Sequence, residues 1–241
     1  MELKSVTQIQ FDAIAVSHEL WLSSGRKEGL CAELSGTVLR ECEFSGKNLT
    51  GASFRNSDLS GMMIRDVTLD DCDFTGANLS GTSLEKVSAL NSNFSNANLH
   101  RLNQCSPGNR QVNMAGALFE NAVLTELFLH SINLTGARFS KAGMGAARLI
   151  YCQLAGAKFT NCSMKGVDFR FAKLDDVDFS GSDLAESIFM EDLPASIVWG
   201  NAILGGMRKI QGGSAPIKRL DHEMDSIYEG KKMSERKAVA S

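Results

Sequence analysis

The chain has 241 residues, of which 43% are hydrophobic and 22% charged, and its formal net charge is −3. These values exclude an intrinsically disordered chain, which has fewer apolar residues and a stronger net charge. The chain is also not strongly basic as a whole, so we expect no direct binding of nucleic acid. No apolar run reaches the roughly 18–20 residues that span a bilayer. The N-terminal residues lack the pattern of a secretory signal.

Residues 1–30 are expected to form an N-terminal cap around an amphipathic helix at residues 5–24. Thr7 and Gln10 have the spacing of a capping box, and Gly25 is a plausible C-terminal stop. A lid over the first repeat and a partner-binding helix are both open interpretations. One face of this helix carries the apolar residues Ile9, Ala13, Val16 and Leu20.

A period of five residues dominates the chain from residue 31 to residue 204. Counting every fifth position from Leu34 to Leu99, and again from Met114 to Phe189, gives 30 positions, of which 29 are Leu, Phe, Met or Ile. The position two residues earlier is Ala, Cys, Ser, Thr or Val in 26 of the 30 cases. A helix requires apolar spacings of three and four, and a strand requires alternation, so neither element explains the pattern.

A chain that turns a corner in every five-residue unit does explain it. Four corners close a square coil of about 20 residues, and successive coils pair as parallel strands about 4.8 Å apart. The large residue of each unit then points into the lumen, and the small residue lets neighbouring turns approach closely. The phenylalanines expected in the lumen include Phe44, Phe74, Phe119, Phe139, Phe159 and Phe179.

The repeated unit has the form Ala-(Asp/Asn)-Leu followed by two variable residues, as in Ala77–Gly81, Ala97–Leu99 and Ser182–Leu184. The chain thereby resembles the pentapeptide-repeat proteins. This resemblance implies an all-β solenoid, a right-handed quadrilateral parallel β-helix, over residues 31–204. An N-terminal capping helix and a C-terminal tail complete the expected fold. The resemblance says almost nothing about function.

The repeat is interrupted at residues 100–113. Kept in phase, this segment would place Gln104 and Asn109 in the lumen, where unpaired amides are costly. Pro107 and Gly108 form a turn signal. We therefore expect a loop at 100–113 that leaves the coil, either as a tolerated insertion or as a functional protrusion. Because the phase of five resumes afterwards, the coils on both sides are expected to stack as one rod.

Residues 205–241 are expected to form a C-terminal linker and tail, in which the repeat has ended. They carry 8 Lys and Arg against 5 Asp and Glu, whereas residues 1–204 carry 17 against 23. The linker is Gln211–Pro216, and Ile217–Lys237 has the composition of a polar helix. Such a tail is usually solvated or frayed. The alternative is an apolar stripe that docks on a partner and consists of Ile217, Leu220, Met224 and Ile227.

The chain shows no motif that carries catalysis or holds a cofactor. Nucleophile-elbow, Walker, dinucleotide-binding and H-E-x-x-H patterns are missing, and no cysteine has the usual spacing of a zinc ligand. We predict no catalytic residue, no metal and no cofactor, and we interpret the protein as a non-enzyme. Four cysteines fall in the small inward position, where they are interpreted as reduced core residues: Cys42, Cys72, Cys152 and Cys162.

Two surface features interrupt the regular pattern and mark a candidate interaction surface. Acidic residues gather in the last coils at Asp168, Asp175, Asp176, Asp178, Asp183, Glu186 and Glu191. Apolar residues occupy outward positions on three successive faces directly after the loop, at Leu118, Val123 and Phe128. Exposed apolar clusters often mark interfaces. The alternative is that these three residues lie beneath the loop or the tail.

The first functional interpretation is a non-catalytic scaffold of the bacterial cytoplasm that binds another protein through the rod, the loop or the tail. The resemblance implies an alternative, an acidic rod that mimics duplex DNA and protects or modulates DNA gyrase or another topoisomerase. A second alternative is a secreted effector or secretion-associated adaptor, delivered without a signal peptide. The C-terminal coils also offer a surface for a homodimer. The sequence does not name the partner.

Overall fold

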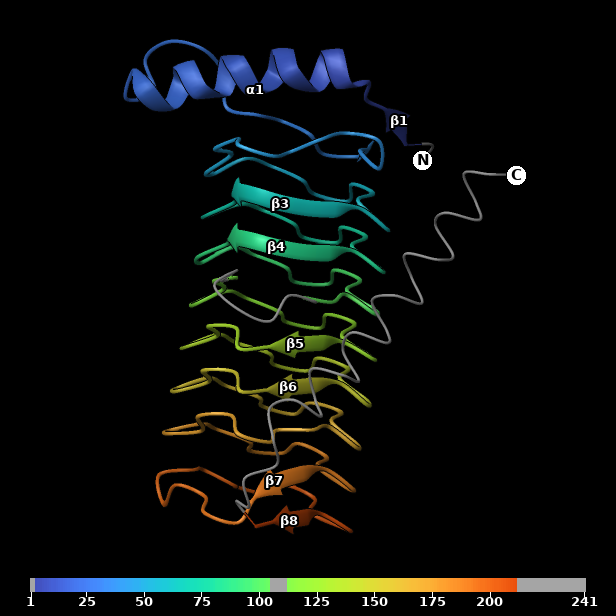
Figure 1. Ribbon diagram of the computed structural model, residues 1–241, viewed down its shortest axis with the longest axis vertical. Coiled ribbons are helices and arrows are strands. Elements are labelled where there is room, and N and C mark those ends of the chain that lie inside the picture. Colours follow the sequence, from blue (N-terminus) through green and yellow to red (C-terminus); the bar gives the residue numbers. More distant parts are fainter. Residues whose placement is uncertain (1–2, 105–111, 212–241) are drawn as a thin grey trace, which may run out of the picture.

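The computed structural model describes residues 3–104 and 112–211, which form a rod of stacked coils with one helix across its first end (Figure 1). The rod is a four-sided parallel β-helix, as the sequence predicts. Its elements in chain order are β1 (Lys4–Ser5), α1 (Gln8–Ser23), β2 (Thr37–Val38), β3 (Met63–Thr68), β4 (Ser83–Ser88), β5 (Phe128–His130), β6 (Arg148–Ile150), β7 (Ile188–Met190) and β8 (Arg208–Ile210).

Each coil meets the next through parallel pairing between residues that lie four repeat units apart in the sequence. Ser53 pairs with Asp73, and Asp73 pairs with Asn93. The longest paired strands are β3 and β4, where Ile64 lies opposite Leu84. The pairs β5–β6 and β7–β8 follow the same parallel register further along the rod. The coil of four units inferred from the period of five is therefore present.

Each coil has four faces, and each face directs one large residue into the lumen. In the coil after Met114 these residues are Phe119, Leu124, Leu129 and Leu134, all of them buried. We number the faces I, II, III and IV in that order. The same face recurs after every fourth unit, so each of the strands from β3 to β8 begins on face III.

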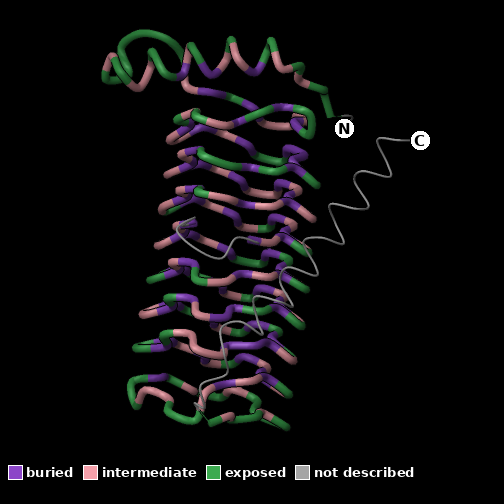
Figure 2. Tube along the Cα trace, in the orientation of Figure 1, coloured by how far each residue is buried: buried purple, intermediate pink, exposed green. Residues whose placement is uncertain are grey.

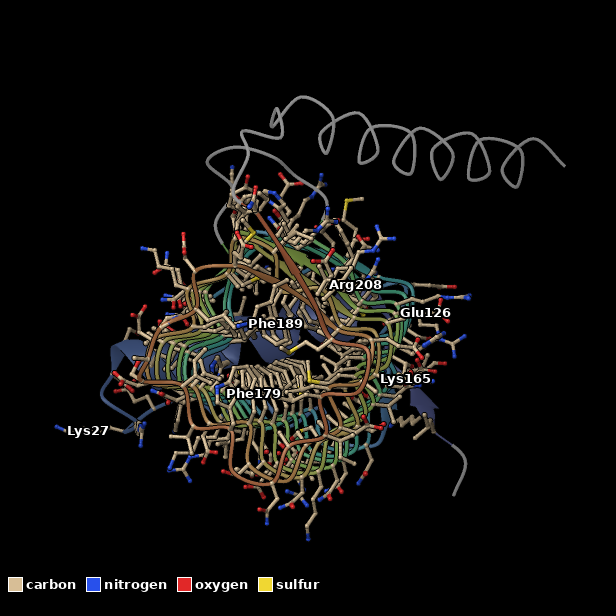
Figure 3. The ribbon with its side chains drawn as sticks, turned by 90° about the horizontal axis from the view of Figure 1, so that it is seen from below. Lys27, Glu126, Lys165, Phe179, Phe189 and Arg208 are labelled. Atoms are coloured by element: carbon tan, nitrogen blue, oxygen red, sulfur yellow. The ribbon has the colours of Figure 1, made fainter. Side chains whose placement is uncertain are left out.

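Stacked aromatic rings fill the lumen behind face I. The ring centroids of Phe74 and Phe94 lie 4.8 Å apart with an interplanar angle of 4°, and the column ends on Trp199. Figure 3 looks along the rod and shows Phe179 and Phe189 inside it. The phenylalanines expected in the lumen are each at most 2% exposed: Phe44, Phe74, Phe119, Phe139, Phe159 and Phe179.

Where an Asp or Asn precedes the lumen residue, its side chain closes the corner of that unit. Asp73 Oδ1 accepts a hydrogen bond from the N–H of Thr75 at 2.9 Å, and Asn93 Oδ1 accepts one from the N–H of Ser95 at 3.0 Å. This side-chain-to-backbone bond is an Asx turn, which explains why the repeat favours Asp and Asn at that position. The corner then requires a positive φ, as at Gly76 with 70°.

Helix α1 begins with the capping box that the sequence predicts. Thr7 Oγ1 accepts a hydrogen bond from the N–H of Gln10 at 3.3 Å, and the N–H of Thr7 donates to Gln10 Oε1 at 3.0 Å. Both bonds satisfy donors that the first turn of a helix leaves unpaired. The helix is held over the first coil by parallel pairing of β1 with β2.

The buried face of α1 differs from the apolar face noted in the sequence. Phe11, Ala15 and His18 are buried, whereas Ile9 and Val16 are 83% and 64% exposed. If the helix is read as a lid, the face that packs on the first coil is thus not the one made by Ile9 and Val16, because α1 carries apolar residues on both sides and spacing alone does not select the face. Packing selects it instead, since the rings of Phe11 and Phe44 stack with their centroids 4.6 Å apart.

The interruption of the coil is narrower than the predicted segment 100–113. Leu102 and Gln104 are buried like the residues of any other unit, and the N–H of Gln104 donates to the carbonyl of Phe128 at 3.0 Å. The predicted start was wrong because one amide side chain in the lumen does not disturb the backbone pairing of its unit. Residues 105–111 lie outside the described residues.

The register shows how much chain the interruption adds. Asn113 pairs with Asn133, which is the ordinary step of four units, whereas Asn93 pairs with Leu118, which is a step of five units. One coil is therefore one unit longer than its neighbours. The extra residues fall between Gln104 on face III and Asn113 on face IV, and the rod continues in phase on both sides.

Candidate interaction surfaces

The three apolar residues predicted as one surface lie on three different faces. Leu118 is on face I, Val123 on face II and Phe128 on face III, next to Asn93, Asn98 and Asn103 respectively. Val123 is 45% exposed, and its other neighbour in the stack, Gly143, has no side chain to cover it. The three residues therefore form no joint patch.

The acidic residues of the last coils are distributed around the rod. Face I carries Asp178, face II carries Asp183 and Glu186, face III carries Asp168 and Glu191, and face IV carries Asp175 and Asp176. Two of them are neutralised by bases: Arg170 Nη2 lies 2.7 Å from Asp168 Oδ2, and Lys165 Nζ lies 3.0 Å from Glu186 Oε1. The late coils therefore present mixed charge on several faces.

A contiguous patch forms on face III and its corner with face IV. The rings of Tyr151 and Phe171 stack at 4.6 Å with an interplanar angle of 8°, and the ring of His130 lies 5.2 Å from Tyr151. The guanidinium carbon of Arg148 lies 6.0 Å from the ring centroid of Phe128. We call Phe128, His130, Arg148, Tyr151 and Phe171 the outer strip. Of the predicted surface residues, Phe128 alone belongs to it.

The backbone of the outer strip is strained at its two aromatic residues. Tyr151 has a φ of 57° and Phe171 a φ of 59°, a region that bulky side chains rarely adopt. Corners throughout the rod have positive φ, and at these two the conformation costs about 1–3 kcal/mol because the side chains are bulky. Sequence reasoning missed both residues because it examined the large and small positions of the repeat. The available signal was a pair of aromatic residues at the same corner of successive coils.

Most of the other exposed large apolar side chains lie at the two ends of the rod; Met63 at the start of β3, which is 50% exposed, is an exception. At the first end they lie on the outer side of α1 and on the turn after it, where Leu30 is 74% exposed. At the other end they belong to the last coil, where Ile203 is 59% and Leu204 37% exposed. Figure 2 shows this last coil largely exposed. Solenoids usually cover such ends with capping segments.

An open groove of about 610 Å³ lies at the corner between faces III and IV in the early coils. Its lining includes Lys47 and Lys86. Each ammonium is paired, since Lys47 Nζ lies 3.1 Å from Asp12 Oδ1 and Lys86 Nζ lies 3.2 Å from Asp66 Oδ1. The groove therefore offers mixed polar contacts and no concentrated charge.

The inward cysteines are buried thiols. Burial raises the pKa of Cys72 and Cys152 to about 12 and that of Cys162 to about 11. The Cys162 thiol donates to the carbonyl of Phe139 at 2.6 Å. Thiolates are the reactive form of cysteine, so these side chains are inert at neutral pH. Cys105 lies outside the described residues.

Within residues 3–104 and 112–211, no three His, Cys, Asp or Glu side chains are grouped as a metal site. Over the same ranges, no helix has both the length and the apolar character needed to cross a membrane. The outer strip supplies ring faces, a guanidinium and an imidazole, which are groups for recognising another molecule.

Solved structures with a similar fold include three pentapeptide-repeat rods. HetL, involved in heterocyst differentiation regulation in the cyanobacterium Nostoc sp. strain PCC 7120, is 23% identical over 75% of this chain and 83% of its own, with a TM-score of 0.39. A trypsin-treated form of QnrB1, a plasmid-mediated fluoroquinolone resistance protein, is 22% identical over 75% and 90%, with a TM-score of 0.42. A protein of the Arabidopsis thaliana thylakoid lumen is 23% identical over 40% and 60%, with a TM-score of 0.32.

Comparison with curated protein sequences finds no match. Comparison with family models finds two models that match. The model described as pentapeptide repeats (8 copies) matches residues 32–71 and 72–103, and the model described as pentapeptide repeat region matches residues 112–189. The two matches leave out residues 104–111, around the point where the register gains one unit. With this register, the stacked lumen and the Asx-turn corners, the chain belongs to the pentapeptide-repeat proteins.

Proposed function

We propose that the protein is a non-catalytic scaffold that binds another protein through the outer strip. The observation that carries this proposal is the Tyr151–Phe171 stack at positive φ. Glycine or asparagine would close the same corners with less strain, as Gly136 and Asn161 do elsewhere in the rod. The stack itself contributes only about 0.5–1.5 kcal/mol, so the fold gains little from the two rings.

The composition of the outer strip indicates the chemistry of its partner. Aromatic residues and arginine are enriched among the residues that dominate binding energy in protein interfaces. Tyr151 and Phe171 are half-buried and Arg148 is exposed. We therefore infer a partner segment that places an apolar or aromatic side chain on the rings and a carboxylate near Arg148.

The test replaces the rings by a residue that tolerates the backbone. In the double variant Tyr151→Asn and Phe171→Asn, we expect a melting temperature equal to or above that of the wild type, because asparagine accepts positive φ. Affinity capture from an extract of the source organism, followed by mass spectrometry, should lose the partner. The matched control is Lys141→Asn with Ala146→Asn, which changes two other corners with φ of 59° and 56° and should keep it. Equal capture by both variants contradicts the proposal.

Mimicry of duplex DNA has weaker support, because the acidic residues occupy all four faces and two of them are paired with bases. Its test is separate. A mimic should alter DNA supercoiling by gyrase, and the effect should weaken with salt, since the screening length is about 8 Å at physiological ionic strength. Lysine at Asp176, Asp183 and Glu191 should then abolish the effect. A wild-type protein without any effect on supercoiling removes this alternative.

An effector or a secretion-associated adaptor would also act by binding a protein. These roles differ from the cytoplasmic scaffold in the identity of the partner, which the capture experiment supplies.

A further inference from the structure

Face I carries a column of outward side chains whose order along five successive coils is apolar, basic, basic, acidic, apolar. Parallel bridges join each member to the next, so the members follow one another at steps of about 4.8 Å along the rod. The coils that carry them stack one above the other (Figure 1). We call this set the face I column: Leu118, Arg138, Lys158, Asp178 and Val198.

The side chains of the face I column are accessible. Val198 is 50% exposed, Arg138 and Lys158 are also exposed, and Leu118 and Asp178 are half-buried. The residue two positions after each of the last four members is small, so these members project from the face. A flat partner laid on face I therefore meets the column first. The small residues are Ser140, Thr160, Ser180 and Gly200.

The charges of the column are not neutralised within the described rod. Arg138 and Lys158 lie opposite each other on neighbouring coils, and like charges in that position repel. Among the described residues, none of the three charged side chains of the column forms an ion pair. Asp178 Oδ1 accepts a hydrogen bond from the N–H of Ser180 at 2.9 Å, which leaves its second oxygen for a cation from outside.

The charge of the surrounding coils changes sign along the rod in the same direction as the column. Residues 127–173 contain seven Lys and Arg and one acid, Asp168, whereas residues 174–207 contain seven Asp and Glu and no base. Two parallel rods in contact at the same coils bring like charges together. An antiparallel pair turns the acidic coils of each copy toward the basic coils of the other, so charge complementarity selects the antiparallel order.

We propose that two copies of the chain associate side by side and antiparallel through face I, around a two-fold axis at Lys158. The face I column is complementary to its own reverse: Leu118 meets Val198 of the second copy, and Arg138 meets Asp178 of the second copy. The two Lys158 side chains face each other at the axis, where each lies one step from an Asp178 of either copy. Such a contact is isologous and closes as a dimer.

A comparison with face III shows why face I is the better surface for this contact. Face III has a similar order in Phe128, Arg148, Asp168 and Ile188. There the acid is only 5% exposed, and Arg170 Nη2 lies 2.7 Å from its Oδ2, so it is not available to a second copy. Faces I and III lie on opposite sides of the coil, so the dimer leaves the outer strip free. This inference therefore does not depend on the proposed function.

The size of the contact predicts its strength. Five units provide about 15 outward residues from each copy, fewer than the 20–30 of a standard interface. Ion pairs between exposed side chains are weak, and salt screens them further. The dimer should therefore form at high protein concentration and low ionic strength.

The test reverses charges of the column in the full-length chain. In sedimentation velocity at rising concentration and low salt, the wild type should reach the mass of a dimer, and added salt should return it to a monomer. Arg138→Glu and Asp178→Arg should each stay monomeric, because each variant places like charges across the contact. An equimolar mixture of the two variants should form one-to-one dimers, because both contacts then join opposite charges.

Two matched controls reverse charges on other faces. Asp183→Arg on face II removes a carboxylate with the same corner hydrogen bond, which Asp183 Oδ1 accepts from the N–H of Ala185 at 3.0 Å. Lys173→Glu on face IV replaces an exposed cation. Both controls change the net charge as much as the test variants do, and both should dimerise like the wild type. Thermal melting verifies that every variant is folded.

Each other outcome overturns the proposal. A wild type that stays monomeric at low salt, or a mixture that stays monomeric, shows that the face I columns do not pair. A dimer that survives high salt and charge reversal indicates an apolar contact, such as one between two last coils. Loss of the dimer in the controls as well shows that net charge governs association and the column does not. Partner capture by monomeric Arg138→Glu tests the outer strip separately.

Discussion

The small inward position of each unit holds neighbouring coils together. Ser92 Oγ donates to the carbonyl of Leu69 at 2.6 Å, and the thiol of Cys72 donates to the carbonyl of Leu49 at 3.0 Å. Alanine fills the same position without a donor, as Ala97 does. The position therefore requires a small side chain. A hydroxyl or a thiol also fits there, because it can donate a hydrogen bond to a carbonyl oxygen of the neighbouring coil.

The buried thiols predict a loss of stability in alkali. The folded-state pKa of Cys152 is raised from 9.0 to about 12 by burial. Its contribution to stability is complete below pH 9 and is lost as pH rises towards 12, because the unfolded chain then binds fewer protons than the folded one. In Cys152→Ala, the free energy of unfolding should fall less steeply between these limits, by up to about 1.4 kcal/mol per pH unit. Denaturant melts at several pH values measure the slope, and equal slopes contradict the burial of this thiol.

Position within the five-residue unit decided which residues the sequence could predict. Phe159 was predictable because a lumen position must be large and apolar in every coil, so repetition amplifies the signal. Tyr151 and Phe171 were missed, because the corner position is compatible with many residue types, so their only signal in the sequence is that an aromatic residue recurs there after 20 residues. Strain at positive φ becomes visible only once the backbone is known.

A buried histidine joins α1 to the first coil. The N–H of Ala32 donates to His18 Nδ1 at 3.0 Å, and the ring of His18 stacks with Trp21 at 5.4 Å. A nitrogen that accepts a hydrogen bond carries no proton, so the bond requires the neutral imidazole. Burial lowers the pKa of His18 below its usual 6.5. Protonation would therefore oppose the docking of the helix.

Mild acid should weaken this cap. Because the folded-state pKa of His18 is lowered, its contribution to stability is present above the unfolded value of 6.5 and is lost as pH falls below it. His18→Asn keeps a side-chain acceptor for the N–H of Ala32 and cannot be protonated in this range. The melting temperature of the wild type should therefore drop more between pH 7 and pH 5 than that of the variant. The comparison variant is His130→Asn on the outer strip, which should follow the wild type. Parallel pH profiles for wild type and His18→Asn would contradict the role of His18.

The existence of α1 was predictable, and its orientation was not. A capping box is a local signal that depends on Thr7 and Gln10 alone. The buried face depends on what the first coil offers, and Phe44 offers a ring that stacks on Phe11. The alternative face, with Ile9 and Val16, is as apolar in sequence and is left outside.

The stacking of the rod continues unbroken on both sides of the insertion. The rings of Phe94 and Phe119, on either side of the longer coil, stack at 5.2 Å with an angle of 7°. The bridge from Asn103 to Phe128 precedes the extra residues, and the bridge from Asn113 to Asn133 follows them. The insertion is therefore confined to one corner, which a sequence read in strict phase cannot distinguish from the loss of several units.

Several irregular features of the rod lie at the corner between faces III and IV. The open groove lies there in the early coils, the insertion follows Gln104, and Tyr151 and Phe171 continue the line in the later coils. At the other corners the residues with positive φ are glycine, asparagine, aspartate, alanine or a charged residue such as Arg101, Glu126 or Lys141, and none of them is aromatic. Within the described residues, aromatic side chains at a corner of positive φ are therefore confined to this edge, which supports the outer strip as the interface.

The register makes the effect of shortening the insertion predictable. Removing Ser106–Arg110 leaves Cys105 and residue 111 between Gln104 and Val112, which restores the period of five and a coil of four units. Because residue 111 would then occupy the corner that requires positive φ, the deletion is combined with Gln111→Gly. The melting temperature should be unchanged or higher, since closing a shorter loop costs slightly less entropy.

Deleting Leu102–Ser106 instead is the matched control, because it removes a segment of the same length but takes two buried side chains with it. This variant should melt at a clearly lower temperature. If the first deletion destabilises the protein as much as the control, residues 105–111 belong to the coil and the longer step from Asn93 to Leu118 has another origin. If it melts like the wild type but loses partner capture, the interface extends from the outer strip into the insertion.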